Sequence, residues 1–250
     1  MTADSSLYRS SDSQSAATRT FPTDRIDIWK VFLDKAKRGC EASVLCPDEL
    51  ARADRFHFEK DRIHFTRCRT ALRFVLADYI AIPAAEIRFE YMKGGKPQLI
   101  VDQNPRGMQF NVSHSGNMAL IAIGGGHRIG VDIEKIRGDV DAVALAERFL
   151  SIRERNGLRA LPDRLRVPGF FACWTRKEAF MKATGEGLSF PLADFSVTIH
   201  PHRDPEVEEI RGNAEAHKRW FLADLSIVDG YRAAVAVEGT PSRPETYAWN

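Results

Sequence analysis

Two acidic side chains lie one residue apart in the stretch GVDIEKI, residues 130–136. The stretch alternates as a β-strand does, so Asp132 and Glu134 share one face while Val131 and Ile133 point to the other, toward the core. A half-exposed strand with an acidic face is the simplest interpretation, because most strands alternate in this way. The alternative is that a cation lies between the two carboxylates, since two anions so close together repel each other.

A third acid occurs in a helical pattern, CWTRKEAFMKATG. Trp174, Glu178 and Lys182 recur every fourth residue and therefore share one face of the helix. Alone, the Glu178–Lys182 pair is typical of a surface salt bridge worth about 0.2–0.5 kcal/mol. The rest of the helix is apolar, which indicates a specific partner for this polar face. If Glu178 joins Asp132 and Glu134, three carboxylates without His or Cys favour a hard cation, and Mg²⁺ is the natural choice.

Such a site predicts a phosphorylated substrate, because Mg²⁺ usually completes its octahedral shell with water and phosphate oxygens. Lys96 is a candidate phosphate ligand, since the absent Cβ atoms of Gly94 and Gly95 would let a ligand approach that bend. Ser113 and His114 end a predicted strand and are further candidates, although a single histidine is more often structural. Five arginines of the first helical region could also point inward, or be solvated: Arg52, Arg55, Arg67, Arg69 and Arg73.

Other chemistries lack support in the sequence. The cluster GGGHRIG lies between two strand patterns and lacks the Lys-Ser/Thr ending of a P-loop, so it is predicted to be a hairpin loop. We find no G-x-S-x-G elbow, no H-E-x-x-H motif and no dinucleotide fingerprint. The net charge of +2 argues against a dedicated nucleic-acid binder. The four cysteines have neither zinc-ligand nor disulfide-framework spacing, which fits a reducing cytoplasm. No apolar run reaches membrane-spanning length, so we expect no membrane partner.

The elements that must position these residues form two similar groups within the 250 residues. The Ser-rich segment 1–22 is predicted to be a disordered tail, because it has few large hydrophobic residues. An N-terminal half, 23–117, and a C-terminal half, 118–250, each show a strand, then helices, then three strands. Helices are expected over 142–161 and 169–185 in the second half. This order predicts an α+β (α/β) fold of two pseudo-duplicated halves, with the active site in the cleft at their seam.

Four motifs in series resemble one family. GGKP, FNVSHSG, GVDIE and WTRKEAFMK, in this order and with these gaps, are similar to the Sfp-type 4′-phosphopantetheinyl transferases. The resemblance runs from about Pro47 to the FSV strand at residues 195–197, and more loosely to the C-terminus. It implies two similar α/β halves with coenzyme A in the seam. The implied reaction moves the phosphopantetheine arm of coenzyme A to a serine of an apo acyl or peptidyl carrier protein and releases adenosine 3′,5′-bisphosphate.

The resemblance also implies residue roles. Asp132 and Glu134 match the metal-binding acids and Glu178 the third acid, with Glu178 also the best candidate for the general base. Lys182 matches a lysine near the transferring phosphate. The resemblance implies coenzyme A phosphate contacts for Lys96 and His114, and 3′-phosphate contacts for Arg52 and Arg55. Ser113 is a candidate coenzyme A contact from its position at the end of the predicted strand. Glu49 stands in the first helical region where a further cation is expected.

Two alternatives stay open from the sequence. The first is a non-catalytic module that binds coenzyme A or a carrier protein, and the second is another Mg²⁺-dependent enzyme acting on a pyrophosphate. The intact acids and Lys182 favour the transferase over a pure binding module. Because both halves of the cleft belong to one chain, a monomer would suffice. The sequence does not identify whether fatty-acid, polyketide or non-ribosomal peptide carriers are served.

Overall fold

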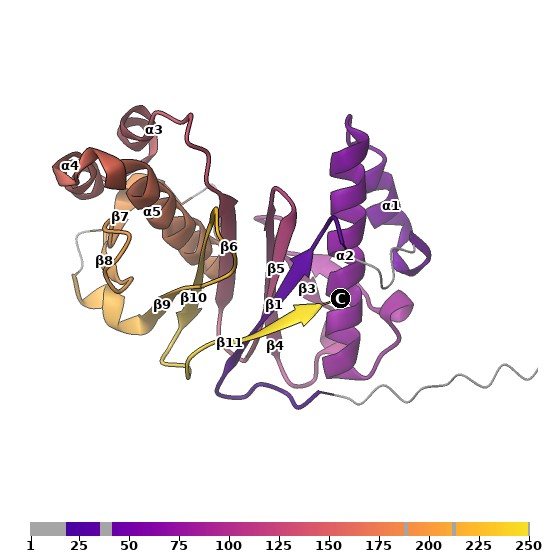
Figure 1. Ribbon diagram of the computed structural model, residues 1–250. Helices are drawn as coiled ribbons and strands as arrows, with labels where there is room; N and C mark the ends of the chain where they lie inside the picture. The colour runs from indigo at the N-terminus through magenta and orange to yellow at the C-terminus, as the bar shows by residue number, and fades with distance from the viewer. Residues whose placement is uncertain (1–18, 36–41, 188–189, 212–213, 250) are drawn as a thin grey trace, which may run out of the picture.

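Two sheets lie between two layers of helix in the computed structural model, which describes residues 19–35, 42–187, 190–211 and 214–249 (Figure 1). The first sheet has the order β11-β1-β5-β4 and the second has the order β6-β10-β9. The first consists of β1 (Ile26–Phe32), β4 (Met108–Ser115), β5 (Met118–Gly125) and β11 (Glu245–Trp249). The second consists of β6 (Ile129–Lys135), β9 (Trp220–Asp224) and β10 (Tyr231–Glu238).

The helices lie on the outer faces of the two sheets (Figure 1). The first sheet is covered by α1 (Pro47–Ala53) and α2 (Glu59–Ile80), and the second by α3 (Ala142–Phe149), α4 (Ile152–Ala160) and α5 (Asp163–Thr184). Two small antiparallel sheets complete the fold: β2 (Phe89–Tyr91) with β3 (Pro97–Leu99), and β7 (Phe195–Val197) with β8 (Val207–Ile210). Short 3₁₀ turns occur at Ala42–Val44, Ala84–Glu86, Val101–Gln103, Leu192–Asp194 and Ala214–Arg219.

The predicted α+β fold of two similar halves is confirmed. Each half runs strand, helices, small two-stranded sheet and hairpin, and the order β1-β5-β4 in one sheet matches β6-β10-β9 in the other. The predicted division at residue 118 falls at the start of β5. Strand β5 pairs along its length with both β1 and β4, because the tight turn at Gly116 folds it back on β4. The second unit therefore begins at β6.

Alternating side chains place the core in three layers. Along β1, Ile26 and Ile28 face the second sheet, whereas Trp29 and Val31 pack against α2. Along β6, the odd-numbered apolar residues Ile129, Val131 and Ile133 fill the space between the sheets, as the alternation predicts. The even-numbered residues of β6 consequently face α5 on the other side of the sheet.

The second group of helices differs from the prediction in two ways. The predicted helix 142–161 is interrupted between α3 and α4, because Ser151 begins a new helix with a capping box. Its hydroxyl accepts from the Glu154 N–H and the Glu154 carboxylate accepts from the Ser151 N–H. Helix α5 starts six residues before the predicted range and continues through Pro168.

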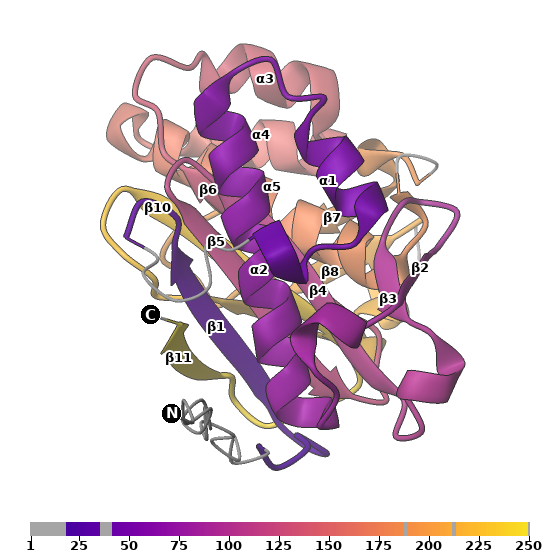
Figure 2. The same cartoon turned by 90° about the vertical axis from the view of Figure 1, so that its right-hand side faces the viewer.

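Four residues of the predicted tail, 19–22, belong to the described part of the chain. Residues 1–18 of the tail lie outside the described part of the chain, but residues 19–22 pack on the first sheet. The Arg19 guanidinium lies 4.3 Å from the ring centroids of both Trp29 and Tyr247. Tyr247 belongs to β11, which returns from the second half to pair in parallel with β1 (Figure 2). Both ends of the described chain are thus attached to the first sheet.

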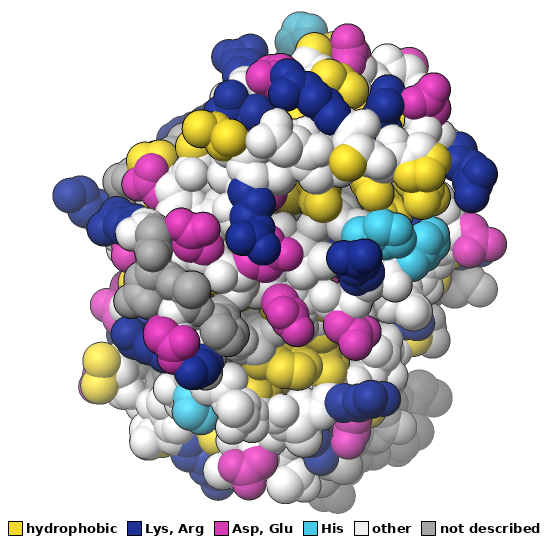
Figure 3. Space-filling view, turned by 90° about the vertical axis from the view of Figure 1, so that its left-hand side faces the viewer, with side chains coloured by type: hydrophobic (Ala, Val, Ile, Leu, Met, Phe, Trp, Pro, Cys, Tyr) yellow, Lys and Arg dark blue, Asp and Glu magenta, His cyan; other side chains and the backbone are white. Residues whose placement is uncertain are grey.

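Three further observations concern the helices, the cysteines and the surface charge. Among the described residues, none of the helices is long and apolar enough to cross a membrane. Cys46, Cys68 and Cys173 are free. On the face of the second half shown in Figure 3, Lys and Arg side chains are interspersed with Asp and Glu.

Candidate active site

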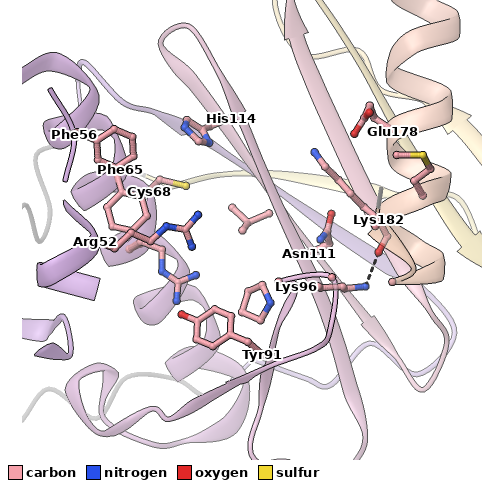
Figure 4. Close-up of a pocket in the computed structure, with 18 residues that line it drawn as sticks. Arg52, Phe56, Phe65, Cys68, Tyr91, Lys96, Asn111, His114, Glu178 and Lys182 are labelled. Carbon is pink, nitrogen blue, oxygen red and sulfur yellow. Dashed lines mark hydrogen bonds between the residues drawn. The ribbon is translucent and has the colours of Figure 1, made fainter. Parts of the chain in front are cut away.

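The site lies where the edge strand of each sheet meets the other. Strand β4 ends the first sheet and β6 ends the second, and the two strands pack against each other. Beside them lies a cavity of about 410 Å³. One wall comes from α1, α2 and the β2–β3 turn, and the opposite wall comes from α5, with β4 between them (Figure 4). The predicted seam between the halves therefore does hold a cleft.

Strand β6 places Asp132 next to Lys182, a residue that lines this cavity. The Asp132 side chain is buried, with 2% of the residue exposed. Its Oδ1 atom accepts hydrogen bonds from the Lys182 ammonium at 2.6 Å and from the Ser113 hydroxyl at 2.8 Å. Lys182 also donates to Ser113 at 2.9 Å, which closes a triangle between β4, β6 and α5. Ser113 thus contacts the acidic group, although the sequence indicated a coenzyme contact.

The other two acids come from β6 and α5 and both interact electrostatically with Asp132. Glu134 follows on β6 and accepts a hydrogen bond from the Ser115 hydroxyl at 2.8 Å. Glu178 lies on α5, one turn before Lys182, and its side chain lines the cavity (Figure 4). The ion pair that Lys182 makes is with Asp132, and not with Glu178 as helical spacing alone would predict.

A glycine brings α5 this close to β6. A Cβ atom at Gly130 would lie 2.1 Å from the Ala179 carbonyl oxygen and 2.3 Å from the Ala183 nitrogen. Only a residue without a side chain therefore permits the observed packing of helix on strand. Because Gly130 and Asp132 share one face of β6, the close approach at Gly130 is what brings Lys182 within hydrogen-bonding distance of Asp132.

The three carboxylates lack sufficient positive charge around them. Burial raises the pKa of Asp132, and the Lys182 ammonium opposes this only in part. Burial also raises the pKa of Glu134 and of Glu178, and in both cases the negative charge of Asp132 raises it further. Lys182 and Arg137 lower the pKa of Glu134 but do not cancel the effect of burial. A bound divalent cation would supply the positive charge that the three acids lack.

The donor set fits a hard divalent cation. Within the described residues, the Asp132 Oδ2 atom is buried and has no hydrogen-bond partner. An orphaned carboxylate oxygen is costly to bury, and oxygen donors without His or Cys suit Mg²⁺. In the same described part of the chain, no group of three His, Cys, Asp or Glu side chains lies close enough to form a metal site as it stands. Asp132 is instead paired with the Lys182 ammonium.

The other side of the cavity is basic. Arg52 and His114 line it, and the pKa of His114 is lowered by burial and by the nearby charges of Lys182, His64 and Arg52. The guanidinium of Arg52 would favour an anionic ligand there. Within the cavity lining, Glu178 and Lys182 therefore come from α5 and Arg52 from α1, whereas Asp132 and Glu134 lie behind Lys182 on β6.

Lys96 lines the cavity but its ammonium is already bonded. It donates to the Ile129 carbonyl oxygen at 2.7 Å and to the Lys182 carbonyl oxygen at 3.0 Å, and so ties the β2–β3 turn to β6 and α5 (Figure 4). Burial, and to a smaller extent Arg128, lowers its pKa to about 8. Lys96 therefore joins the two halves, a contact that the sequence did not indicate.

The other candidate arginines are either exposed or bonded to groups of the protein itself. Arg55 is exposed and is not among the residues lining the cavity. Arg69 and Arg73 are buried and donate to the carboxylate of Glu49 at 2.6 and 2.7 Å. Glu49, at a position where a cation was expected, is therefore the counter-ion of a buried structural cluster. Arg67 donates to the Leu33 carbonyl and is likewise structural.

Sequence reasoning missed Asn111 and Ser115. The Asn111 side-chain oxygen accepts from the Val131 N–H at 2.8 Å, and Ser115 bonds Glu134 as described above. The signal that could have found them is the polar alternation N-x-S-x-S in a strand that is otherwise apolar, since it places three polar side chains on one face.

Two family descriptions cover most of the chain. "4′-Phosphopantetheinyl transferase, N-terminal" matches residues 35–124, and the "4′-phosphopantetheinyl transferase superfamily" matches residues 128–236. The gap between the two matches falls at the turn between β5 and β6, where the second structural unit begins. The chain belongs to the 4′-phosphopantetheinyl transferase superfamily.

Relatives named for that activity align over 76% to 90% of this chain. The 4′-phosphopantetheinyl transferase HetI of Nostoc sp. is 37% identical over 228 residues, which cover 90% of this chain and 93% of the relative. Sfp of Bacillus subtilis is 29% identical over 222 residues, covering 87% and 94%. The L-aminoadipate-semialdehyde dehydrogenase-phosphopantetheinyl transferase of Mus musculus is 28% identical over 205 residues, covering 76% and 66%. The protein is thus a 4′-phosphopantetheinyl transferase, an enzyme that transfers phosphopantetheine from coenzyme A to carrier proteins.

Proposed function

We propose that this transfer depends on Mg²⁺ held by Asp132, Glu134 and Glu178, and that it releases adenosine 3′,5′-bisphosphate. The observation that carries the proposal is the unpartnered, buried Asp132 Oδ2 atom among three carboxylates whose pKa values are all raised. A bound Mg²⁺ would offset the charge of the pyrophosphate oxygens as the phosphorus is attacked. Asp132 and Glu134 are fixed on β6, whereas Glu178 would approach from α5.

Each residue of the chain has a separate task in this proposal. The hydroxyl of the carrier serine forms a bond to the phosphorus that bears the pantetheine, while the bond from that phosphorus to the bridging oxygen of the pyrophosphate breaks. Glu178 takes the hydroxyl proton directly or through water, and its raised pKa makes it a better base. Lys182 lies at the acidic end of the cavity, where its ammonium can contact the transferring phosphate.

Coenzyme A would lie along the cavity with its nucleotide end toward α1. Arg52 and His114 line that wall, which supports their predicted role as phosphate contacts. Arg69 lines it too, although its guanidinium is bonded to Glu49. Ser113 would act through Asp132 and Lys182. We do not propose a coenzyme A contact for Arg55, because it is not among the residues that line the cavity.

The partner is an apo carrier protein, and the residues of one chain complete the site, so a monomer suffices. We expect no nucleic-acid or membrane partner. The reaction is expected in the cytoplasm, which agrees with the free state of the three described cysteines. Which class of carrier is served stays a question for a panel of purified apo carriers.

The test is to mix the protein with coenzyme A, Mg²⁺ and an apo carrier, and to measure the intact mass of the carrier. A gain of one phosphopantetheine is expected, and it should disappear with EDTA or when the acceptor serine of the carrier is replaced by alanine. Adenosine 3′,5′-bisphosphate should form in equal amount. An unmodified carrier with tight coenzyme binding would instead indicate a binding module, and coenzyme breakdown without carrier would indicate a hydrolase.

A further inference from the structure

Side chains of β4 join the two halves of the site. Strands β4 and β6 are the edges of different sheets, and in the described residues no backbone ladder connects them. Asn111, Ser113 and Ser115 alternate along β4, and each bonds a group of β6 instead. These three side chains take the place that backbone hydrogen bonds have inside a sheet. We call them the polar seam.

Ser115 makes two hydrogen bonds across this seam. Its hydroxyl donates to the Glu134 Oε2 atom at 2.8 Å and accepts from the backbone N–H of Lys135 at 3.1 Å. One lone pair of the Ser115 oxygen accepts the N–H of Lys135. This bond restricts rotation of the hydroxyl, so that its O–H points toward the Glu134 carboxylate. Ser115 therefore fixes the Glu134 carboxylate against the backbone of its own strand.

We propose that Ser115 is a positioning residue for the transfer reaction, which acts by holding the Glu134 carboxylate in one orientation. This inference rests on the proposed role of Glu134 as a ligand of the divalent cation. Glu134 is half-buried and has three rotatable side-chain bonds, so without the hydroxyl its carboxylate can turn away from Asp132. A ligand that must first be ordered binds a cation less well than one already in place.

The other members of the polar seam support this role. Asn111 is buried and holds the N–H of Val131, the residue before Asp132. Ser113 holds Asp132 itself. The seam therefore contacts both acids of β6 and the backbone beside them. Ser115 is the member best suited to a test, because it does not line the cavity and its hydrogen bonds go to Glu134 and the Lys135 backbone.

The experiment compares Ser115→Ala with Ser115→Thr and with Ser196→Ala. Ser196 is the control, since its hydroxyl is likewise hydrogen-bonded, to Ser151 at 2.8 Å, but lies on β7, outside the polar seam. For each folded variant we would measure kcat with an apo carrier, the Kd of coenzyme A, and Mg²⁺ affinity by calorimetry. Ser115→Ala should lower kcat at least tenfold and weaken Mg²⁺ binding at least threefold, with the Kd of coenzyme A within twofold of wild type. Ser115→Thr should restore both values, and Ser196→Ala should keep them.

Several results would overturn the inference. The inference is wrong if a folded Ser115→Ala variant has wild-type kcat and wild-type Mg²⁺ affinity. It is also wrong if Ser196→Ala lowers kcat and Mg²⁺ affinity as much as Ser115→Ala does. If Ser115→Ala does not fold, Ser115→Cys keeps the side-chain volume with a weaker donor, and wild-type values in that variant count against the inference. A wild-type enzyme that modifies no carrier argues against the proposed function instead, while the calorimetric comparison still tests Ser115.

Discussion

Replacing Gly130 by alanine should separate the two elements that carry the acids. The added Cβ atom would lie 2.1 Å from the Ala179 carbonyl oxygen, whereas ordinary van der Waals contact begins at 3.4 Å. The atoms it would meet are backbone atoms of α5, which cannot turn aside as a flexible side chain can. Helix α5 must therefore shift by about 1.3 Å relative to β6, the difference between those two distances.

The expected effect on stability follows from overpacking. Inserting a methyl group into a filled core typically costs about 1–3 kcal/mol. For a chain of this length, each kcal/mol lowers the melting temperature by about 2–4 °C, so a decrease of about 2–12 °C is expected. The effect on transfer should be larger, because a displacement near 1 Å can cost about 100-fold in rate when it misplaces reacting groups. Lys182 and Glu178 both move with α5.

The assay compares thermal unfolding and steady-state transfer for Gly130→Ala, wild type and Gly138→Ala. Gly138 is the matched control, because a Cβ atom there meets nothing within 4 Å. The control should keep both the melting temperature and the rate. Wild-type rate and stability in Gly130→Ala would refute the argument that this glycine sets the distance between β6 and α5. A lower melting temperature with an unchanged rate would show that the site tolerates the shift.

Three further predictions concern the charged groups of the cavity. Glu178→Gln should lower kcat at least 100-fold, as expected for loss of a general base, while the Kd of coenzyme A changes little. An unchanged kcat would exclude Glu178 as the base. Arg52→Ala should weaken coenzyme A binding about three- to tenfold in calorimetry, because Arg52 lines the cavity. Arg55→Ala should leave the affinity unchanged, because Arg55 does not line it. Equal effects of the two substitutions would contradict this assignment. Because the pKa of Lys96 is lowered to about 8, the folded protein loses this proton before the unfolded chain, whose lysine titrates near 10.5. The free energy of unfolding, measured in urea, should therefore rise between about pH 8 and 10.5 relative to Lys96→Met, and a parallel pH dependence of the two proteins would disprove the shift.

The periodicity of apolar residues in the sequence predicted those features that depend only on residues close together in the chain. The alternation in β6 correctly placed Val131 and Ile133 in the core and put the acids on the opposite face. The helical pattern placed Glu178 and Lys182 on the side of α5 that lines the cavity. Both results follow from the fixed periods of strand and helix, which set the direction of a side chain without knowledge of its partner. The helix break at Ser151 was also readable, since S-x-x-E is a capping-box pattern.

These local patterns could not predict which distant segments of the chain pair with each other. Strand β11 pairs with β1 across more than 200 residues of sequence, and β5 joins the first sheet although it resembles the start of a second unit. An arginine has the same local pattern whether it lines a cavity, as Arg52 does, or neutralises a buried carboxylate, as Arg73 does. Only the packing of α2 against Glu49 distinguishes these two cases.

The sequence by itself determined the chemical groups of the site: three carboxylates, one lysine one turn after the last of them, and the motifs of a phosphopantetheinyl transferase. The tertiary structure decided how those groups are held. It showed that Lys182 pairs with Asp132, that Lys96 bonds backbone carbonyls, and that Asn111 and Ser115 join the strands. The physical reason is that residue type and spacing fix charge and direction, whereas a hydrogen bond between segments depends on distances that arise only when both halves pack together.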